Sequence, residues 1–254
     1  MDTLFSSAYM ALGYAKSRPA VHPHVMSRIV SHLNIQTAVH RALDVGCGAG
    51  LSTRVLEGIA QQCYGIDPVE AMVKAAPQVA SHASFAVAAA EFLPFSSSSI
   101  HLITAAGSLN YTNLDLFFPE AIRVLATHCM LVVYDFSQGK SFRNEDTLDT
   151  WFNEFRQRYP APPSGAVALN PDVIQSLDSG FQTEGDELFQ VGLTLSKQTY
   201  LDYMMTETNV AFAIANGATL DQVTAWCSES LEPVFEDNSK EVLFNGYIVY
   251  LQKP

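Results

Sequence analysis

Charged side chains are scarce in this sequence of 254 residues, and basic ones are the scarcest. Charged residues make up 16% of the chain and hydrophobic residues 48%, a composition that excludes an intrinsically disordered protein. The 26 acidic and 14 basic side chains leave a formal net charge of −12. Because a field of this sign repels nucleic-acid phosphates, we expect no nucleic-acid partner. A small molecule or another protein is the favoured binding partner.

Paired cysteines and long apolar runs are also missing. Cys47, Cys63, Cys129 and Cys227 lack the spacing of a zinc site or a redox disulfide, so we predict no metal and expect reduced thiols in the core. No stretch reaches the length of a membrane span, and the first residues show no basic region followed by an apolar run. The sequence therefore predicts a cytoplasmic protein without a membrane span. It leaves the oligomeric state undetermined.

Short apolar strands alternate with helical patterns between residues 41 and 136, which is typical of a parallel sheet covered by helices. The strands are too apolar to face water on one side, so we expect both of their faces to be buried. Two helices between them are expected to bury apolar faces, one with Leu51, Val55, Leu56 and Ile59 and one with Leu116, Phe117, Ala121, Val124 and Leu125. The predicted strands are 42–45, 63–66, 84–87, 101–105 and 129–134.

A glycine-rich turn, Gly46-x-Gly48-x-Gly50, directly follows the first strand and opens a helix. Backbone N–H groups and the helix dipole can meet a ligand there, and only glycine lets the backbone approach it so closely. The same turn would also serve as a tight strand-to-helix connection. Asp67 ends the second strand about 20 residues later, where an acidic residue receives ribose hydroxyls. It could equally cap a helix before Pro68.

An ordered set of motifs carries a resemblance to a known family. Leu-Asp-Val-Gly-Cys-Gly-Ala-Gly is followed by Gly-Ile-Asp-Pro and then by Ala-Glu-Phe-Leu-Pro-Phe, within residues 40–136. This region resembles class I S-adenosylmethionine-dependent methyltransferases, in particular those of the ubiquinone and menaquinone type. The resemblance implies a Rossmann-like, doubly wound, mostly parallel α/β sheet of seven strands whose last strand is antiparallel. The segments would be a helical cap (1–36), a cofactor-binding core (37–140), helical insertions with a strand near 188–195 (141–231) and a closing strand (232–254).

The resemblance also implies a set of contacts to S-adenosylmethionine. The turn would approach the methionine part of the cofactor, Asp67 would bind both ribose hydroxyls, and Asp44 would position the turn. Ala89 stands where family members often have Asp or Asn, and His101 stands where they usually have Asp. The implied cofactor-binding residues are Asp44, Gly46, Cys47, Gly48, Gly50, Asp67, Pro68, Met72, Ala89, Ala90, Glu91 and Ala106, with Tyr14 and Arg18 of a Tyr-x-x-x-Arg-Pro segment near the cofactor's carboxylate.

A glycine-rich turn of this kind also occurs in three other classes of ligand-binding protein. An NAD(P)-dependent oxidoreductase shares the acidic ribose ligand, but Leu51 occupies the place of its third glycine and no Tyr-x-x-x-Lys pair follows. A phosphate-binding P-loop is excluded, because no Gly-Lys-Ser/Thr is present. A non-catalytic cofactor-binding regulatory protein stays open.

The methyl acceptor is expected beyond the carboxyl ends of the strands, near Asn110, Tyr111, Asp135 and Phe136. Asp135 is the first candidate for a general base, although it could also cap a turn, and Tyr111 is a second catalytic candidate or a pocket wall. His22 and His24 are weaker candidates. We expect the 142–231 insertions, including the segment 203–209, to form much of the pocket for a small organic acceptor. A protein acceptor is the second possibility.

Overall fold

The computed structural model describes residues 13, 15–236 and 239–254. The chain divides into two compact units. The sheet unit contains residues 22–136, 165–189 and 246–254, and the helical unit contains the described residues up to 21 together with 137–164 and 190–245. The long strands β7 (Gln182–Leu195) and β8 (Lys240–Gln252) contribute residues to both units. Each unit is described by itself below.

The sheet unit follows the predicted alternation of strands and helices. Each predicted strand of the core is present and longer than expected, by one to six residues. Its elements are α2 (His22–His32), β1 (Val39–Val45), α3 (Leu51–Leu56), β2 (Ala60–Asp67), α4 (Glu70–Ala75), η1 (Ala76–Gln78), β3 (Ala83–Val87), β4 (Ile100–Ala106), η2 (Leu109–Tyr111), α5 (Leu114–Val124), β5 (Leu125–Phe136) and α7 (Pro171–Ser176).

The strand order of the sheet is β3-β2-β1-β4-β5-β8-β6, with β7 pairing with β8. Strands β1 to β5 are parallel to their neighbours, and β8 runs antiparallel to β5. The prediction of a doubly wound, mostly parallel sheet with an antiparallel last strand is therefore confirmed. The two-residue strand β6 (Ser141–Phe142) joins the seven predicted strands.

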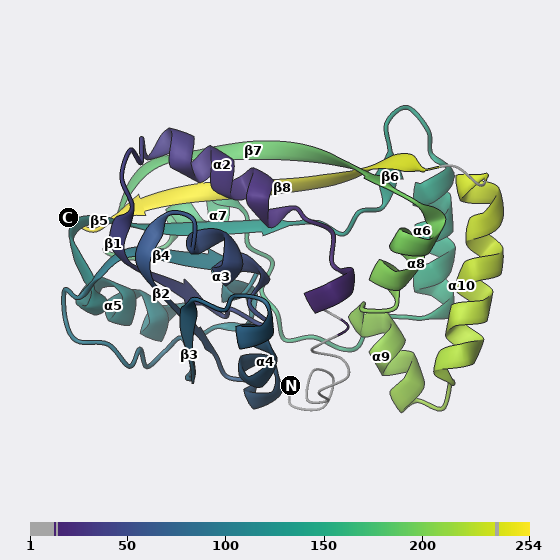
Figure 1. Ribbon diagram of the computed structural model, residues 1–254, viewed down its shortest axis with the longest axis horizontal. Helices are drawn as coiled ribbons and strands as arrows, with labels where there is room; N and C mark the ends of the chain where they lie inside the picture. The colour runs from purple at the N-terminus through teal and green to yellow at the C-terminus, as the bar shows by residue number, and fades with distance from the viewer. Residues whose placement is uncertain (1–12, 14, 237–238) are drawn as a thin grey trace. The chain divides into compact units, whose positions relative to one another are not determined.

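Helices cover both faces of the parallel strands (Figure 1). On one face, the buried side chains of α5 and α7, such as Phe117 and Ile174, join alternate strand residues in one apolar cluster. The buried residues of α2, including Val25 and Ile29, lie outside that cluster, and α2 contacts α3. Because β1 is parallel to its neighbours β2 and β4, the carboxyl ends of these three strands meet at one edge of the sheet. Parallel α/β sheets bind their ligands at that edge.

Three expectations about burial were wrong. The first concerns α3, which buries Ser52, Thr53 and Leu56 rather than an all-apolar face. The two hydroxyls are buried because they donate hydrogen bonds to the buried carboxylate of Asp44. Leu116 on α5 is 48% exposed, since it lies off the helix face that meets the sheet. Strand β3 is mostly exposed because it pairs only with β2 at the edge of the sheet.

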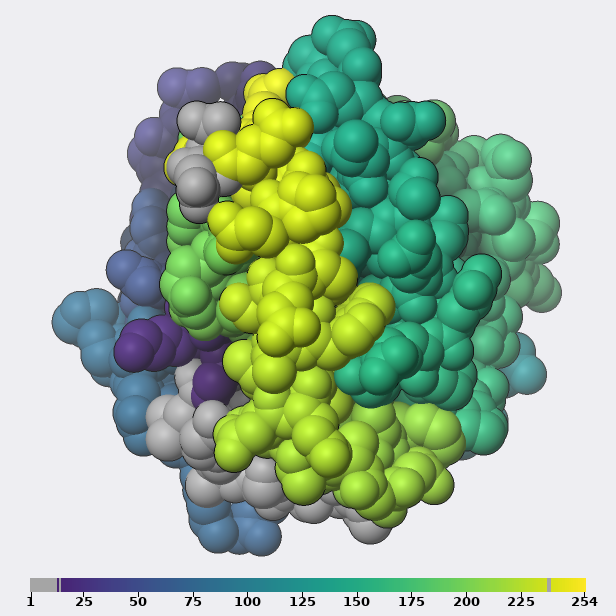
Figure 2. All heavy atoms as spheres, turned by 90° about the vertical axis from the view of Figure 1, so that its right-hand side faces the viewer, coloured from purple at the N-terminus to yellow at the C-terminus, as the bar shows by residue number. Residues whose placement is uncertain are grey.

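The helical unit contains α6 (Thr147–Arg158), α8 (Lys197–Met204), α9 (Thr208–Ala215) and α10 (Leu220–Phe235). The predicted helical stretch 195–215 is interrupted at residues 205–207. Figure 2 faces α10, with α6 beside it. Trp151 of α6 stacks on Phe155 and on Trp226 of α10, and its indole N–H donates to Ser230 Oγ at 2.8 Å. Many aromatic side chains of this segment therefore pack against one another.

The four cysteines are free thiols. Burial raises the pKa of Cys63 to about 11 and that of Cys227 to about 12, so these two thiols are protonated at neutral pH. Within residues 13, 15–236 and 239–254, no helix is long and apolar enough to cross a membrane. In the same residues, no group of three or more His, Cys, Asp or Glu side chains could hold a metal ion.

Candidate functional site

The glycine-rich turn after β1 holds three glycines with positive φ angles, and the space around them differs. Gly46 has φ +70°, and a Cβ there would lie 2.2 Å from Ser108 Cβ. Gly50 has φ +90°, and its Cβ would lie 3.0 Å from the carbonyl oxygen of Ala76. Gly48 has φ +50°, and its Cβ would meet nothing within 4 Å. Gly46 and Gly50 are therefore required by packing, whereas Gly48 borders open space.

The carboxylate of Asp67 lies against this turn. Its Oδ2 accepts the backbone N–H of Gly48 at 2.9 Å, and its Oδ1 accepts the N–H of Val69 at 2.8 Å. Burial raises the pKa of Asp67, and the two backbone N–H donors lower it in part. The second bond is a local turn, and the alternative of a helix cap is wrong, because the N-cap of α4 is Val69 and no side chain caps it. The first joins the end of β2 to the glycine turn of β1, so one carboxylate organises both ends of the candidate site.

Asp44 lies inside the protein, behind the turn. It is fully buried and accepts hydrogen bonds from Ser52 Oγ at 2.6 Å, Thr53 Oγ1 at 2.7 Å and Thr104 Oγ1 at 3.1 Å. Burial raises the pKa of Asp44 to about 6, although the three hydroxyls lower it. Asp44 thus ties β1 to α3 and β4, as expected for a residue that positions the turn.

Stability should depend on pH through Asp44. The folded protein holds the Asp44 proton up to about pH 6, whereas the ordinary pKa of an aspartate is 3.8, so the folded state binds more protons than the unfolded state between these pH values. Stability from this group is therefore complete below the unfolded pKa and is lost as pH rises through the folded pKa. In urea titrations, the stability advantage of wild type over Asp44→Asn should grow by about 1–2 kcal/mol from pH 7.5 to pH 5. An equal advantage at both pH values would contradict this.

The remaining predicted cofactor residues of the sheet unit surround the same strand ends. Cys47 and Met72 are buried, and Pro68 is exposed. Ala90 is buried and Ala89 half-buried in the loop after β3, while Ala106 is half-buried at the last position of β4. The carboxylate of Glu91 accepts the N–H of Asn113 at 2.8 Å. Their contacts with a cofactor stay predictions.

A second polar cluster lies at the carboxyl ends of β4 and β5. Asp135 accepts a hydrogen bond from Asn110 Nδ2 at 3.1 Å and from the N–H of Phe136 at 2.8 Å. Burial raises the pKa of Asp135, and these two donors lower it in part. Gly107 is packed so closely that a Cβ would lie 2.8 Å from Asp135 Oδ1. Tyr111 is 55% exposed, so its ring does not share the burial of Asp135.

His22 also lies at the end of β5. Its Nδ1 is 2.9 Å from the hydroxyl of the fully buried Tyr134, and its ring meets Phe136 edge-on at 5.2 Å. His24 is exposed. Of the two histidines considered from the sequence, the structure therefore brings only His22 to the strand ends where an acceptor is expected.

Arg18 belongs to the helical unit. Its guanidinium pairs with the buried carboxylate of Glu207 at 3.0 Å and lies 5.2 Å from the centre of the Tyr203 ring. Its Nη2 donates to the carbonyl of Thr206 at 3.3 Å. Tyr14 lies outside the described residues. The role of both residues at a cofactor carboxylate stays a prediction.

Comparison with known proteins identifies the core. Residues 43–133 match the family model described as a methyltransferase domain. This segment is a methyltransferase domain. The prediction of a methyltransferase domain is thereby confirmed for this segment. The matched segment contains the end of β1, all of β2 to β4 and most of β5, and so the glycine turn and Asp67.

Individual relatives agree with the family model. A provisionally named methyltransferase of Dictyostelium discoideum is 27% identical over 145 residues, which cover 57% of this chain and 53% of the relative. The chain thus spans about half the length of this curated relative. A provisionally assigned type II methyltransferase from Anaeromyxobacter dehalogenans has a TM-score of 0.68 at 20% identity, over 90% of this chain and 94% of that one.

A third similar protein was solved with small molecules. It is a phosphoethanolamine N-methyltransferase of Haemonchus contortus in complex with phosphomonomethylethanolamine and S-adenosylhomocysteine. Its TM-score is 0.52 at 15% identity, and the match covers 91% of this chain and 52% of that one. At such identities the likeness to both solved structures is one of fold.

Sequence reasoning missed three residues that shape the site. Ser108 packs on Gly46 and donates to the carbonyl of Val45 at 2.6 Å, Tyr134 contacts His22, and Arg123 binds the loop after β3. The position of Tyr134 beside Asp135 at a strand end could have indicated it. No local pattern indicates these contacts of Ser108 and Arg123, because Val45 and Phe95 lie more than 25 residues away from them along the chain.

Proposed function

We propose that this protein is an S-adenosylmethionine-dependent methyltransferase that methylates a small organic molecule. The observation that carries the proposal is the pairing of the Gly48 N–H with the Asp67 carboxylate beside open space. At the ends of two adjacent strands, the turn lets a ligand come close to the backbone, and Asp67 offers a charged acceptor for ribose hydroxyls. The residues therefore fit the cofactor.

Different residues hold different parts of the cofactor in this proposal. The turn from Gly46 to Gly50 holds the methionine part, and Asp67 accepts the two ribose hydroxyls. Ala89 and Ala90 flank the adenine ring, on which Met72 packs. The cofactor, when bound, supplies an activated methyl group, so the protein has to align the acceptor and exclude water. No nucleophile on the protein is required.

Asp135 is proposed as the group that takes a proton from the acceptor. Its raised pKa makes it a better proton acceptor than an exposed aspartate, and Asn110 fixes one of its oxygens. His22, held by the Tyr134 hydroxyl, is a second polar group at the same strand end. An acceptor that bears a hydroxyl or a protonated amine needs such a group.

A small organic acceptor is favoured by the net charge of −12, which disfavours nucleic acids. A neighbour of the same fold, the Haemonchus contortus enzyme, holds a small phosphorylated amine. The aromatic side chains of α6 and α10 support this class less than expected, because they pack on one another. A protein acceptor and a non-catalytic regulatory role are the competing outcomes. The cytoplasmic location stays a prediction.

Replacing Asp135 tests the proton-transfer role. Asp135→Asn should lower kcat by about 10²–10⁴-fold, because the amide cannot take a proton, and should leave the Kd of S-adenosylhomocysteine unchanged. The wild-type rate should rise with pH through the Asp135 pKa, since the base must be ionised, and the variant should lack that limb. The matched control is Asp115→Asn, which makes the same substitution at an exposed carboxylate in the first turn of α5. Normal kcat in Asp135→Asn would exclude this role.

Acceptor screening tests the function itself. Libraries of small organic molecules and peptides would be incubated with radiolabelled S-adenosylmethionine at concentrations where binding has been confirmed. Labelled small-molecule product is expected. Label only on peptides would shift the proposal to a protein acceptor, and confirmed cofactor binding without any product would favour the regulatory role.

A further inference from the structure

The loop of residues 88–99 joins β3 to β4 and carries Ala89 and Ala90, which the proposed function places at the adenine ring. Its apolar anchoring is uneven, since Leu93 is 3% exposed whereas Phe92 is 72% exposed. The short backbone bonds within it, from Phe92 to Ala89 and from Phe95 to Leu93, form isolated turns. Ala90 and Leu93 belong to the apolar core, and Ala88 and Phe95 pack against it, so core packing anchors part of the loop. Polar contacts to the loop backbone hold it in addition.

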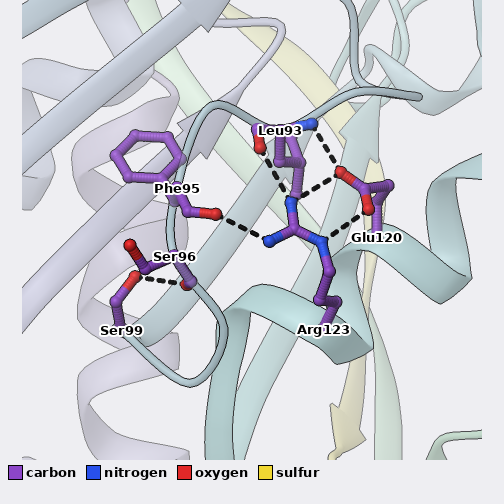
Figure 3. A network of polar contacts seen from close by, with 6 residues as sticks. All are labelled: Leu93, Phe95, Ser96, Ser99, Glu120 and Arg123. Carbon is purple, nitrogen blue, oxygen red and sulfur yellow. Dashed lines mark hydrogen bonds and ion pairs between the residues drawn. The ribbon is translucent and has the colours of Figure 1, made fainter.

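Arg123 of α5 supplies that support (Figure 3). Its Nη1 donates to the carbonyl of Phe95 at 2.7 Å, and its Nη2 donates to the carbonyl of Leu93 at 2.9 Å. Glu120, one turn earlier, accepts two hydrogen bonds from Arg123 and one from the N–H of Leu93 at 2.9 Å. Two side chains of one helix thus bind three backbone groups of the loop.

A second tether lies at the other end of α5. The Glu91 carboxylate accepts the N–H of Asn113, the residue directly before the helix, at 2.8 Å. The loop is therefore held at Glu91 near the adenine-side residues and at Leu93 and Phe95 farther along. Both tethers end on the same helix.

We expect these tethers to position the loop and to add little to the free energy of unfolding. The side chains of Arg123 and Glu120 are 37% and 23% exposed, and a partly exposed ion pair between residues three apart contributes little to folding. A planar guanidinium can bind two carbonyls and a carboxylate at once, which an ammonium group cannot do with the same geometry. What the pair provides is a defined path for the loop.

We propose that Arg123, Glu120 and Glu91 are positioning residues that fix the 88–99 loop so that its backbone selects adenine over hypoxanthine. This inference rests on the proposed function. The loop N–H at Ala90 would donate to the unprotonated ring nitrogen of adenine, and hypoxanthine carries an N–H at that place. A fixed loop therefore discriminates between the two bases, and a loosened loop does not.

The test compares the Kd of S-adenosylhomocysteine with that of S-inosylhomocysteine by calorimetry. Wild type should prefer the adenine ligand at least about tenfold, as expected when one ligand leaves a donor unpaired. In Arg123→Ala this preference should fall several-fold toward unity, and Arg123→Lys should recover only part of it. Arg28→Ala is the matched control, because Arg28 is also a helix arginine of the sheet unit, paired with Glu187 at 3.1 Å. An unchanged preference in a folded Arg123→Ala protein overturns the inference.

Amide hydrogen exchange gives a readout that needs no ligand. The Leu93 N–H donates to Glu120, so its exchange should accelerate about tenfold or more in Glu120→Ala and in Arg123→Ala, and not in Arg28→Ala. An unchanged exchange rate of the Leu93 N–H in these variants would show that Glu120 and Arg123 do not fix the loop, even if the cofactor binds. If wild type binds neither nucleoside, the proposed function fails, while the exchange result still decides whether α5 fixes the loop.

Discussion

Replacing Asp67 with alanine is expected to weaken S-adenosylhomocysteine binding by about 1–3 kcal/mol, roughly 5- to 150-fold in Kd. The ribose hydroxyls would lose a charged acceptor that lies at the end of β2 and is 8% exposed. The Gly48 and Val69 N–H groups would also lose their acceptor, so the glycine turn would loosen where the cofactor meets it. Calorimetry on the purified variant measures the change.

Asp67→Asn is the matched control, because its remaining oxygen can still accept one of the two backbone N–H groups. It should bind the ligand with an affinity between those of wild type and Asp67→Ala. Thermal unfolding of each variant shows how much of the loss comes from the fold. If a folded Asp67→Ala protein binds the ligand as wild type does, Asp67 does not belong to the ribose site.

Gly46→Ala should mainly lower the stability of the fold, whereas Gly48→Ala should mainly abolish ligand binding. Gly46→Ala should destabilise the fold by roughly 2–5 kcal/mol, because a Cβ at a positive φ would overlap Ser108 Cβ. Gly48→Ala should cost only about 1–2 kcal/mol, because its Cβ enters open space. That Cβ would fill the space that we propose for the cofactor, so Gly48→Ala should lose ligand binding while remaining folded.

Two outcomes test the packing argument. The double variant Gly46→Ala/Ser108→Gly should regain part of the lost stability, since it removes the atoms that the new Cβ would strike. Urea unfolding measures that recovery, and calorimetry measures binding. A Gly48→Ala protein that binds S-adenosylhomocysteine normally would show that the turn does not contact the ligand.

The core strands could be predicted because their apolar runs are local and uninterrupted. The antiparallel placement of β8 came from the family resemblance, and its pairing with β5 bears it out. The buried face of α3 could not be predicted from hydrophobicity, because Ser52 and Thr53 are buried where their hydroxyls donate hydrogen bonds to Asp44. A pattern of apolar residues cannot reveal a polar residue buried for hydrogen bonding.

The candidate site divides in the same way. The turn and Asp67 could be found because their motif lies within about 20 residues and has a fixed meaning in this type of sheet. Ser108 and Arg123 could not, because their contacts depend on the tertiary fold. The pairing of Arg18 with Glu207, 189 residues later, was equally invisible in the sequence. The proposed acceptor side depends on such contacts, so the sequence predicts a place for it and does not predict the acceptor.

Calorimetry of the wild-type protein with S-adenosylmethionine and with NADPH tests the central claim most directly. We expect S-adenosylmethionine to bind at one site per chain and NADPH to give no heat of binding. The reason is that the glycine turn, Leu51 and Asp67 suit a sulfonium nucleoside rather than a dinucleotide. Binding of NADPH without binding of S-adenosylmethionine would contradict the account.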